Sequence, residues 1–138
     1  MLSARNQIDV TVEEVNNGAV NAFLVLTTTH GTKMYASITE SSTENMNIKV
    51  GDKVIAFFKA SHVLIGVGWS MPISARNKLQ GTIKTIRKGA VNSEISVKLP
   101  IGDIVSSIIT NEAVDEMALK EGDEVVAIIK SSDVMIAK

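Results

Sequence analysis

The chain has 138 residues, of which 45% are hydrophobic and 4% aromatic, and its formal net charge is −1 at pH 7. It contains no cysteine, which excludes disulfides and thiolate metal ligands. The near-neutral charge argues against a nucleic-acid-binding protein, because such proteins need a basic surface that displaces counterions from phosphates. The first residues include no apolar signal core, and no apolar run is long enough to cross a bilayer. We therefore expect a cytoplasmic protein without a membrane partner.

The chain is a tandem repeat. Residues 2–67 align without a gap with residues 73–138, and 22 of the 66 pairs are identical. The period is too long for a solenoid unit and close to the lower size limit of a small domain. We predict two domains, residues 1–67 and 73–138, joined by a linker at 68–72. Because a domain of this size is marginally stable by itself, we expect the two to pack on each other or on other subunits.

Alternation of apolar and polar residues predicts five short strands in the first repeat. In chain order they cover residues 8–15, 20–28, 33–38, 53–58 and 63–67. Tight turns are expected around Gly18 and Gly31, where Asn, His and Thr flank a glycine. A short helix is expected over 41–46, where Ser41 and Glu44 have the spacing of a capping box.

The second repeat predicts the same elements in the same order. Its strands are expected over 79–86, 91–99, 104–109, 124–129 and 134–136, with a helix over 112–119. Five strands with a helix between the third and the fourth are typical of a small closed barrel of the OB type. We therefore predict a mostly β protein of two tandem five-stranded OB-type barrels, each with one short helix. A split sandwich remains an alternative, because strand period does not distinguish the two.

Residue patterns typical of enzymes are missing. The two histidines are not repeated: His30 aligns with Ile101, and His62 aligns with Asp133. No zinc-protease, nucleophile-elbow or phosphate-loop pattern occurs. We predict that both histidines are surface turn residues, that the protein holds no metal cation and that it is not an enzyme.

The polar residues that both repeats share are mostly hydrogen-bond donors. They are Ser3, Arg5, Thr39, Lys59 and Ser61, with Ser74, Arg76, Thr110, Lys130 and Ser132 at the equivalent positions. Hydroxyls, cations and backbone amides without a carboxylate suit an oxyanion, whose oxygens accept hydrogen bonds.

Each of these residues also has a structural explanation. The threonines can be helix N-caps, the lysines can keep strand ends soluble, and Gly18 and Gly89 suit tight turns. We interpret Asp52 and Asp123 as turn residues rather than ligands. The arginines are harder to explain by solvation alone, because each lies inside an identical Ser-Ala-Arg-Asn block.

Four motifs, in this order, carry a resemblance to a known family. The second repeat contains Ser-Ala-Arg-Asn, Lys-Gly-Ala-Val-Asn-Ser-Glu, Ile-Thr-Asn-Glu-Ala-Val and Glu-Gly-Asp-Glu-Val-Val-Ala-Ile-Ile-Lys-Ser-Ser-Asp-Val. This pattern resembles the mop domain, a TOBE-like module of the OB type that binds molybdate and tungstate. The resemblance covers nearly the whole chain, twice. The first repeat departs from the pattern at Asn16-Asn17, at Phe23 in place of Glu94, and at His62 in place of Asp133.

The resemblance implies a cytoplasmic protein that stores and buffers molybdate or tungstate and takes part in metal homeostasis. It also implies a homo-oligomer, with a trimer favoured, whose anions lie at domain and subunit interfaces. We expect the bare oxyanion to be the ligand, without an organic cofactor and without nucleic acid as a partner.

The resemblance further implies which residues hold the anion. The family's ligands correspond to Ser3, Arg5, Lys59, Ala60 and Ser61 in one repeat and to Ser74, Arg76, Lys130, Ser131 and Ser132 in the other. A facing domain would add Thr39 and Ser42, or Thr110, whose partner position is Ala113 and lacks a hydroxyl. A weaker second type of site would use the glycine turns, with Ala19, Val20, Asn21, Ala90, Val91 and Asn92.

Two other functions remain open at this point. The chain could be a molybdate-responsive regulatory or interaction module that acts on a partner protein. It could also be an OB-fold nucleic-acid binder, but such sites need stacking aromatic residues. All five aromatic residues lie in the first repeat or the linker: Phe23, Tyr35, Phe57, Phe58 and Trp69.

Overall fold

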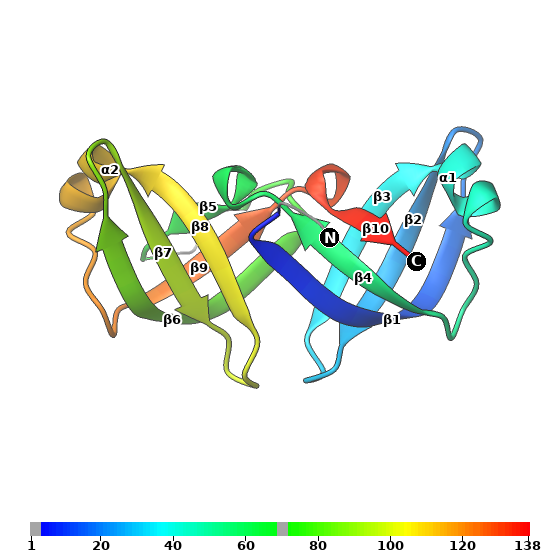
Figure 1. Ribbon diagram of the computed structural model, residues 1–138, viewed down its shortest axis with the longest axis horizontal. Coiled ribbons are helices and arrows are strands. Elements are labelled where there is room, and N and C mark those ends of the chain that lie inside the picture. Colours follow the sequence, from blue (N-terminus) through cyan, green and yellow to red (C-terminus); the bar gives the residue numbers. More distant parts are fainter. Residues whose placement is uncertain (1–3, 69–71) are drawn as a thin grey trace.

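The protein is described by a computed structural model that covers residues 4–68 and 72–138. Two curled antiparallel sheets of five strands each lie side by side, and each carries one short helix at its outer end (Figure 1). The first repeat forms β1 (Asn6–Asn17), β2 (Asn21–Thr28), β3 (Lys33–Thr39), β4 (Lys53–Phe58) and β5 (Leu64–Gly66). The second forms β6 (Asn77–Lys88), β7 (Asn92–Lys98), β8 (Ile104–Thr110), β9 (Glu124–Ile129) and β10 (Met135–Ala137). The mostly β fold and the ten strands are as predicted.

The helices are α1 (Glu40–Asn45) and α2 (Asn111–Glu116), and two 3-10 helices, η1 (Ala60–His62) and η2 (Ser131–Asp133), follow β4 and β9. No helix in the part of the chain that the structure describes is long and apolar enough to span a membrane.

The long first strand of each repeat allows the sheet to curl. In β1, residues 6–11 pair with β4 and residues 10–17 pair with β2, with a bulge between Val12 and Glu14. A bulge bends a strand and increases its twist, so one strand can serve both halves of a barrel. The edges of the first sheet then approach each other, because η2 and β10 contact β3. The second sheet curls in the same way, with η1 against β8, and this is the OB-type barrel that the sequence predicts.

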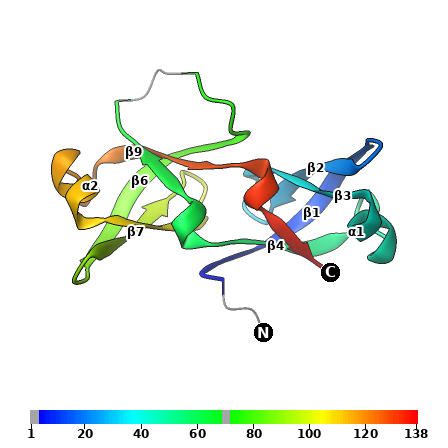
Figure 2. The same ribbon diagram turned by 90° about the horizontal axis from the view of Figure 1, so that it is seen from above.

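The two repeats exchange their last strands. β10 of the second repeat pairs with β4, where Ile136 lies opposite Ala56, and β5 of the first repeat pairs with β9, where Ile65 lies opposite Ala127. Figure 2 shows β10 leaving the second repeat to lie along the first. The folded units therefore differ from the sequence repeats in their last strand. The exchange is possible because the two final strands occupy equivalent positions in the two repeats, so that either sheet edge can accept either strand.

One continuous hydrophobic core runs through both barrels. Its fully buried side chains include Phe58 and Leu24 in the first barrel and Ile83 and Ile129 in the second. Ile136, on the exchanged strand, belongs to the same core. Burial of apolar surface contributes about 25 cal/mol per Å², so this shared core holds the two repeats together as one unit.

The N-termini of the helices differ from the predicted capping box. Thr39 caps α1 by accepting a hydrogen bond from the Ser42 N–H at 3.1 Å, and Thr110 caps α2 in the same way through Ala113. The box at Ser41 and Glu44 is therefore wrong, because the N-cap is Thr39, two residues before Ser41.

Helix α2 is shorter than predicted. It ends at Glu116, and Ala118 then takes a left-handed conformation with φ of 49° while Leu119 N–H bonds to the carbonyl of Val114. This closing hydrogen bond terminates the helix before Leu119.

Two buried asparagines join each repeat to the other. The side-chain amide of Asn77 bonds to both the N–H and the C=O of Tyr35, at 2.8 and 2.9 Å. Asn6 bonds in the same way to Ser106, which is the position equivalent to Tyr35, at 2.8 Å for both contacts. Only 3% of Asn6 and 1% of Asn77 is exposed. The last residue of each Ser-Ala-Arg-Asn block thus fixes one repeat to an edge strand of the other.

A third polar contact between the repeats joins Asp103 to Thr28 and His30. It has no counterpart, because the equivalent positions are Thr32, Leu99 and Ile101. The hydroxyl of Thr28 donates to Asp103 at 2.6 Å, and His30 Nδ1 lies 2.9 Å from the other oxygen of Asp103. Burial raises the pKa of Asp103, but hydrogen bonds from Thr28, His30 and Thr32 outweigh it and lower that pKa below its ordinary value. His30 is a turn residue, as predicted, and it also links the two repeats.

Candidate oxyanion site

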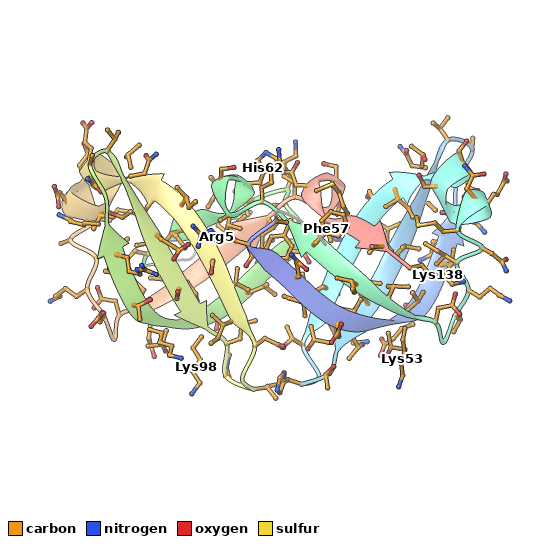
Figure 3. The ribbon with its side chains drawn as sticks, viewed as in Figure 1. Arg5, Lys53, Phe57, His62, Lys98 and Lys138 are labelled. Carbon is orange, nitrogen blue, oxygen red and sulfur yellow. The ribbon has the colours of Figure 1, made fainter. Side chains whose placement is uncertain are left out.

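A cleft of about 280 Å³ lies where the two repeats meet. Its lining residues come from both repeats: Ala4, Arg5, Phe57, Lys59, Ala60, Ser61, Ile108 and Met135. Four of the predicted site residues, Arg5, Lys59, Ala60 and Ser61, are thus brought together. Figure 3 shows Arg5, Phe57 and His62 in the middle of the molecule, between the two barrels.

The short 3-10 helices place the lysines and serines of the site. Lys59 follows β4 and precedes η1, whose turn is closed by the His62 N–H donating to the Lys59 carbonyl at 3.0 Å. The end of η1 is fastened to β8 of the other repeat, because the buried Ser107 hydroxyl donates to the Val63 carbonyl at 2.6 Å. Lys130 precedes η2 in the same way. Each lysine therefore lies next to an edge strand of the opposite repeat.

Arg5 is paired with a carboxylate from the other repeat. Its Nη1 lies 2.8 Å from Glu94 Oε2 on β7, and its side chain is 62% exposed whereas that of Glu94 is 18% exposed. The contact is an ion pair rather than an aligned hydrogen bond, because the buried Oε2 accepts no hydrogen bond from the described residues. A second cation, Arg87, lies 3.9 Å from the other carboxylate oxygen of Glu94.

Arg76 has a different environment. Its guanidinium carbon lies 4.7 Å from the ring centre of Phe23 and 5.1 Å from that of Tyr35. The two rings are stacked on each other, with centres 5.7 Å apart and planes inclined by 19°. Cation–π attraction holds the guanidinium without neutralising its charge. Within residues 4–68 and 72–138, no carboxylate forms an ion pair with Arg76.

The remaining predicted ligands lie outside this cleft or outside the described residues. Ser3 is one of the residues that the structure does not describe. Ser74 is exposed and precedes Ala75, which packs against Val126 and Ile128. Lys130 and Ser132 are exposed, and the hydroxyls of Ser131 and Ser37 share a hydrogen bond of 3.1 Å.

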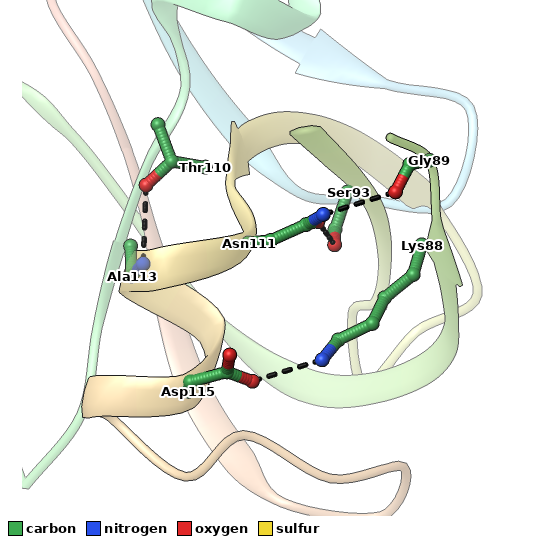
Figure 4. Close-up of polar contacts among 7 residues, drawn as sticks. All are labelled: Lys88, Gly89, Ser93, Thr110, Asn111, Ala113 and Asp115. Atoms are coloured by element: carbon green, nitrogen blue, oxygen red, sulfur yellow. Dashed lines mark hydrogen bonds and ion pairs between the residues drawn. The ribbon is translucent and has the colours of Figure 1, made fainter. Parts of the chain in front are cut away.

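The helix caps lie far from the cleft within one chain. Figure 1 places α1 and α2 at opposite ends of the molecule, whereas η1 (green) and η2 (red) lie in the middle. Thr39 donates to the Ser42 hydroxyl at 2.9 Å, which leaves the Ser42 proton for an outside acceptor. Figure 4 shows the second cap, where Thr110 accepts from Ala113 N–H and no neighbouring hydroxyl takes its proton. Each cap therefore retains one hydroxyl donor.

The glycine turns are built mainly by backbone contacts. A side chain at Gly18 would place its Cβ 2.8 Å from the Asn21 carbonyl oxygen, so glycine is required for the turn itself. The next residues are open to solvent, with Val20 71% and Val91 69% exposed. The carbonyl of Val91 accepts from the Asn111 N–H at the start of α2. The turns with the weaker predicted ligands (Ala19, Val20, Asn21, Ala90, Val91 and Asn92) thus lie beside the helix caps.

The other acidic residues do not gather into a metal site. Across the residues that the structure describes, no group of three or more His, Asp or Glu side chains could hold a cation. Asp52 and Asp123 accept backbone hydrogen bonds from Lys49 and Lys120 at 2.9 Å, which confirms them as turn residues. His62 lies on η1, and its Nδ1 is 3.8 Å from Asp133 Oδ1 on η2.

Sequence reasoning did not assign a role to Glu94, Phe23, Tyr35 or the two asparagines. For the asparagines the signal was their place in the identical Ser-Ala-Arg-Asn blocks, and for Phe23 and Glu94 it was their difference in the alignment of the repeats. That difference was visible, but the arginines that Phe23 and Glu94 contact lie in the other repeat and are known only from the fold.

The chain is similar to known proteins in both sequence and fold. The sequence model of the TOBE domain matches residues 2–65 and 73–136. A solved structure of the cytoplasmic molybdate-binding protein ModG, with molybdate bound, superposes with a TM-score of 0.93 at 40% identity, over 99% of this chain and 97% of that chain.

Two curated relatives match along nearly the whole chain. MopA of Rhodobacter capsulatus, a molybdenum-pterin-binding protein, is 37% identical over 98% of this chain and 51% of its own length. The molybdenum transport protein ModE of Azotobacter vinelandii is 33% identical over 98% of this chain and 50% of its own. The chain therefore spans about half the length of these curated relatives.

Proposed function

Because this chain belongs to the TOBE-domain family, we propose that it binds molybdate or tungstate as bare oxyanions and stores and buffers them in the cytoplasm. The protein would act as a binding protein rather than as an enzyme. The observation that carries the proposal is the cleft between the repeats, where Arg5, Lys59 and Ser61 lie together; none of the lining residues is acidic, and the one carboxylate that pairs with them, Glu94, approaches Arg5 from outside the lining.

The chemistry of this lining matches the ligand. Molybdate is a tetrahedral dianion that carries no proton at neutral pH, so all its oxygens accept hydrogen bonds. Guanidinium, ammonium and hydroxyl groups donate, and hydrogen bonds between charged partners are about twice as strong as neutral ones. The backbone of Ala60 in the first repeat and of Ser131 in the second would add further donors at the start of each 3-10 helix.

Selectivity against other oxyanions follows from the same donors. A phosphate that keeps one proton would place an O–H against a donor, which costs affinity. Sulfate has the same charge and shape as molybdate but is smaller, so its rejection depends on cavity size. Molybdate and tungstate should hardly be separated by this site.

We propose that a facing subunit completes each site. Thr39 and Ser42 belong to the start of α1 and Thr110 to the start of α2, and both helices lie at the outer ends of the molecule, away from η1 and η2, so one chain does not bring them to its own cleft (Figure 1). The exposed Val20 and Val91 beside these caps supply apolar surface for such a contact. A homo-oligomer, with a trimer favoured, would place the caps of one chain over the cleft of another, and the anion would then stabilise the assembly.

The experiment that tests the function is native mass spectrometry of the purified protein, titrated in parallel with molybdate, tungstate, sulfate and phosphate. We expect a defined oligomer that takes up several molybdates or tungstates and ignores sulfate and phosphate. An oligomer that takes up none of the four anions would overturn the storage proposal and favour the interaction module that acts on a partner protein. Uptake of sulfate in equal number would instead overturn the assigned ligand.

A further inference from the structure

The two arginines of the oxyanion sites face equivalent positions that have diverged. Phe23 and Glu94 occupy the same position in the two repeats, and each contacts the arginine of the opposite repeat. We call the cleft that contains Arg5, Lys59 and Ser61 the Arg5 site, and we call the equivalent residues of the second repeat, Arg76, Lys130 and Ser132, the Arg76 site.

At the Arg5 site, one of the two cations is already compensated. Glu94 lies 2.8 Å from Arg5, and because its carboxylate is largely buried, the nearby solvent screens its charge only partly. Arg87 approaches the same carboxylate only to 3.9 Å and is itself 78% exposed. A dianion at this site therefore meets Lys59 and an arginine whose charge is offset by Glu94.

At the Arg76 site, the guanidinium is oriented without losing its charge. The rings of Phe23 and Tyr35 contact its face, and a guanidinium that stacks through its face keeps the N–H groups at its edge for an anion. Stacking also reduces the rotational freedom that Arg76 would lose on binding. Lys130 forms no ion pair with any described residue, so two uncompensated cations remain.

The Arg76 site also has more hydroxyl groups than the Arg5 site. The Arg76 site has Ser131 and Ser37, whose hydroxyls lie 3.1 Å apart, where the Arg5 site has Ala60 and Ile108. The hydroxyl pair supplies a donor that the alanine and isoleucine do not. The other nearby carboxylate is Asp133, which follows Ser132 on η2; its Oδ1 lies 3.8 Å from His62 Nδ1 on η1, and among the described residues it forms no ion pair with Arg76 or Lys130.

We propose, resting on the function proposed above, that the two oxyanion sites are unequal and that position 23/94 sets the difference. The Arg76 site binds the dianion more tightly, and Glu94 keeps the Arg5 site weak. A chain of this kind holds the anions at its Arg76 sites firmly and releases those at its Arg5 sites while the concentration of free anion is still higher. The two affinities widen the range of anion concentrations over which the protein buffers.

The test uses reciprocal variants of the full chain and calorimetric titration with molybdate as the probe. Glu94→Gln removes the carboxylate and keeps the shape, and we expect the affinity of the weak class to rise about tenfold while the tight class is unchanged. Phe23→Glu brings a carboxylate to Arg76, and we expect the tight class to weaken about tenfold. Phe23→Leu is the matched control, because it removes the ring without adding charge and should cost less than Phe23→Glu.

The outcomes separate this inference from the function on which it rests. If the wild-type protein binds no molybdate, both fail. If it binds molybdate but Glu94→Gln leaves the weak class unchanged or weakens it, only the inequality set by Glu94 fails, and the carboxylate instead positions Arg5. Glu94→Gln is decisive even if Phe23→Glu does not fold, because Gln is isosteric with Glu and the change leaves the core intact; circular dichroism checks the fold of each variant.

Discussion

The asparagines Asn6 and Asn77 lie in matching surroundings, whereas the arginines one residue earlier in each repeat do not. Each asparagine bonds to the backbone N–H and C=O of one residue in the opposite repeat. Each arginine contacts side chains there instead, a carboxylate in one case and two aromatic rings in the other. Contacts to the backbone survive sequence divergence because every residue carries the same N–H and C=O. Contacts to side chains change whenever the partner residue changes.

The largest expected effect concerns the asparagines. Asn77→Ala and Asn6→Ala each leave a partly buried backbone N–H and C=O without partners, and we expect each to lower the free energy of unfolding by about 2–4 kcal/mol. Because the two surroundings match, the two losses should agree to within about 1 kcal/mol. Urea denaturation followed by circular dichroism measures both.

The matched control for the asparagines is Asn16→Ala. Asn16 is exposed at the end of β1, and its loss should change stability by less than about 0.5 kcal/mol. A large difference between the Asn6 and Asn77 variants would contradict the equivalence of the two contacts.

The arginines should behave unequally in binding. Arg76→Ala removes an uncompensated cation, and we expect about 30- to 100-fold weaker molybdate binding at the sites to which it contributes. Arg5→Ala removes a cation that Glu94 offsets, and we expect a loss of about tenfold or less at the other sites. Calorimetric titration resolves the two classes, and native mass spectrometry counts the sites that remain.

Arg87→Ala serves as the control for Arg76→Ala, because Arg87 is exposed and its ion pair is with Glu94 at the Arg5 site. It should leave the tight class unaltered. Equal loss of all sites from either single arginine variant would argue against separate sites in the two repeats.

The smallest expected effect concerns the contact of Asp103 with Thr28 and His30. Asp103→Asn replaces the carboxylate that accepts from Thr28 and His30, and we expect a loss of about 1–2 kcal/mol at pH 7. The pKa of Asp103 is lowered from its ordinary value of 3.8 in the folded state. Its contribution to stability is therefore complete above pH 3.8, and it is lost as the pH falls through the lower pKa of the folded protein.

Unfolding free energies of wild type and Asp103→Asn, measured between pH 7 and pH 2, check the sign. The two curves should converge at the acid end, because protonation removes the carboxylate from the wild type as well. Asp115→Asn is the control, since its carboxylate is exposed and pairs with Lys88 at the surface. Parallel curves for the Asp103 variant and the wild type would show that the carboxylate does not carry the contact.

The candidate site residues divide according to whether their partners lie in the same repeat or in the opposite one. The sequence pointed to Arg5, Lys59, Ala60 and Ser61 as candidate ligands, and the pairing of β1 with β4 within the first repeat brings them to one cleft. It also identified Thr39 and Thr110 as possible caps, and they are caps because capping involves residues three positions apart. It could not identify Glu94 or Phe23 as partners of the arginines, because each of them contacts the arginine of the opposite repeat and only the packing of the two repeats brings them together.

The sequence by itself determined the duplication, the ten strands, the two helices and the donor-rich residues shared by both repeats. These depend on periodicity and turn chemistry, which act over a few residues. Only the tertiary structure decided that β5 and β10 change places, that the asparagines bind the opposite repeat, and that one arginine meets a carboxylate while the other meets aromatic rings. The physical reason is that two similar repeats offer each strand and each side chain two chemically comparable partners, and the packing of the whole chain selects between them.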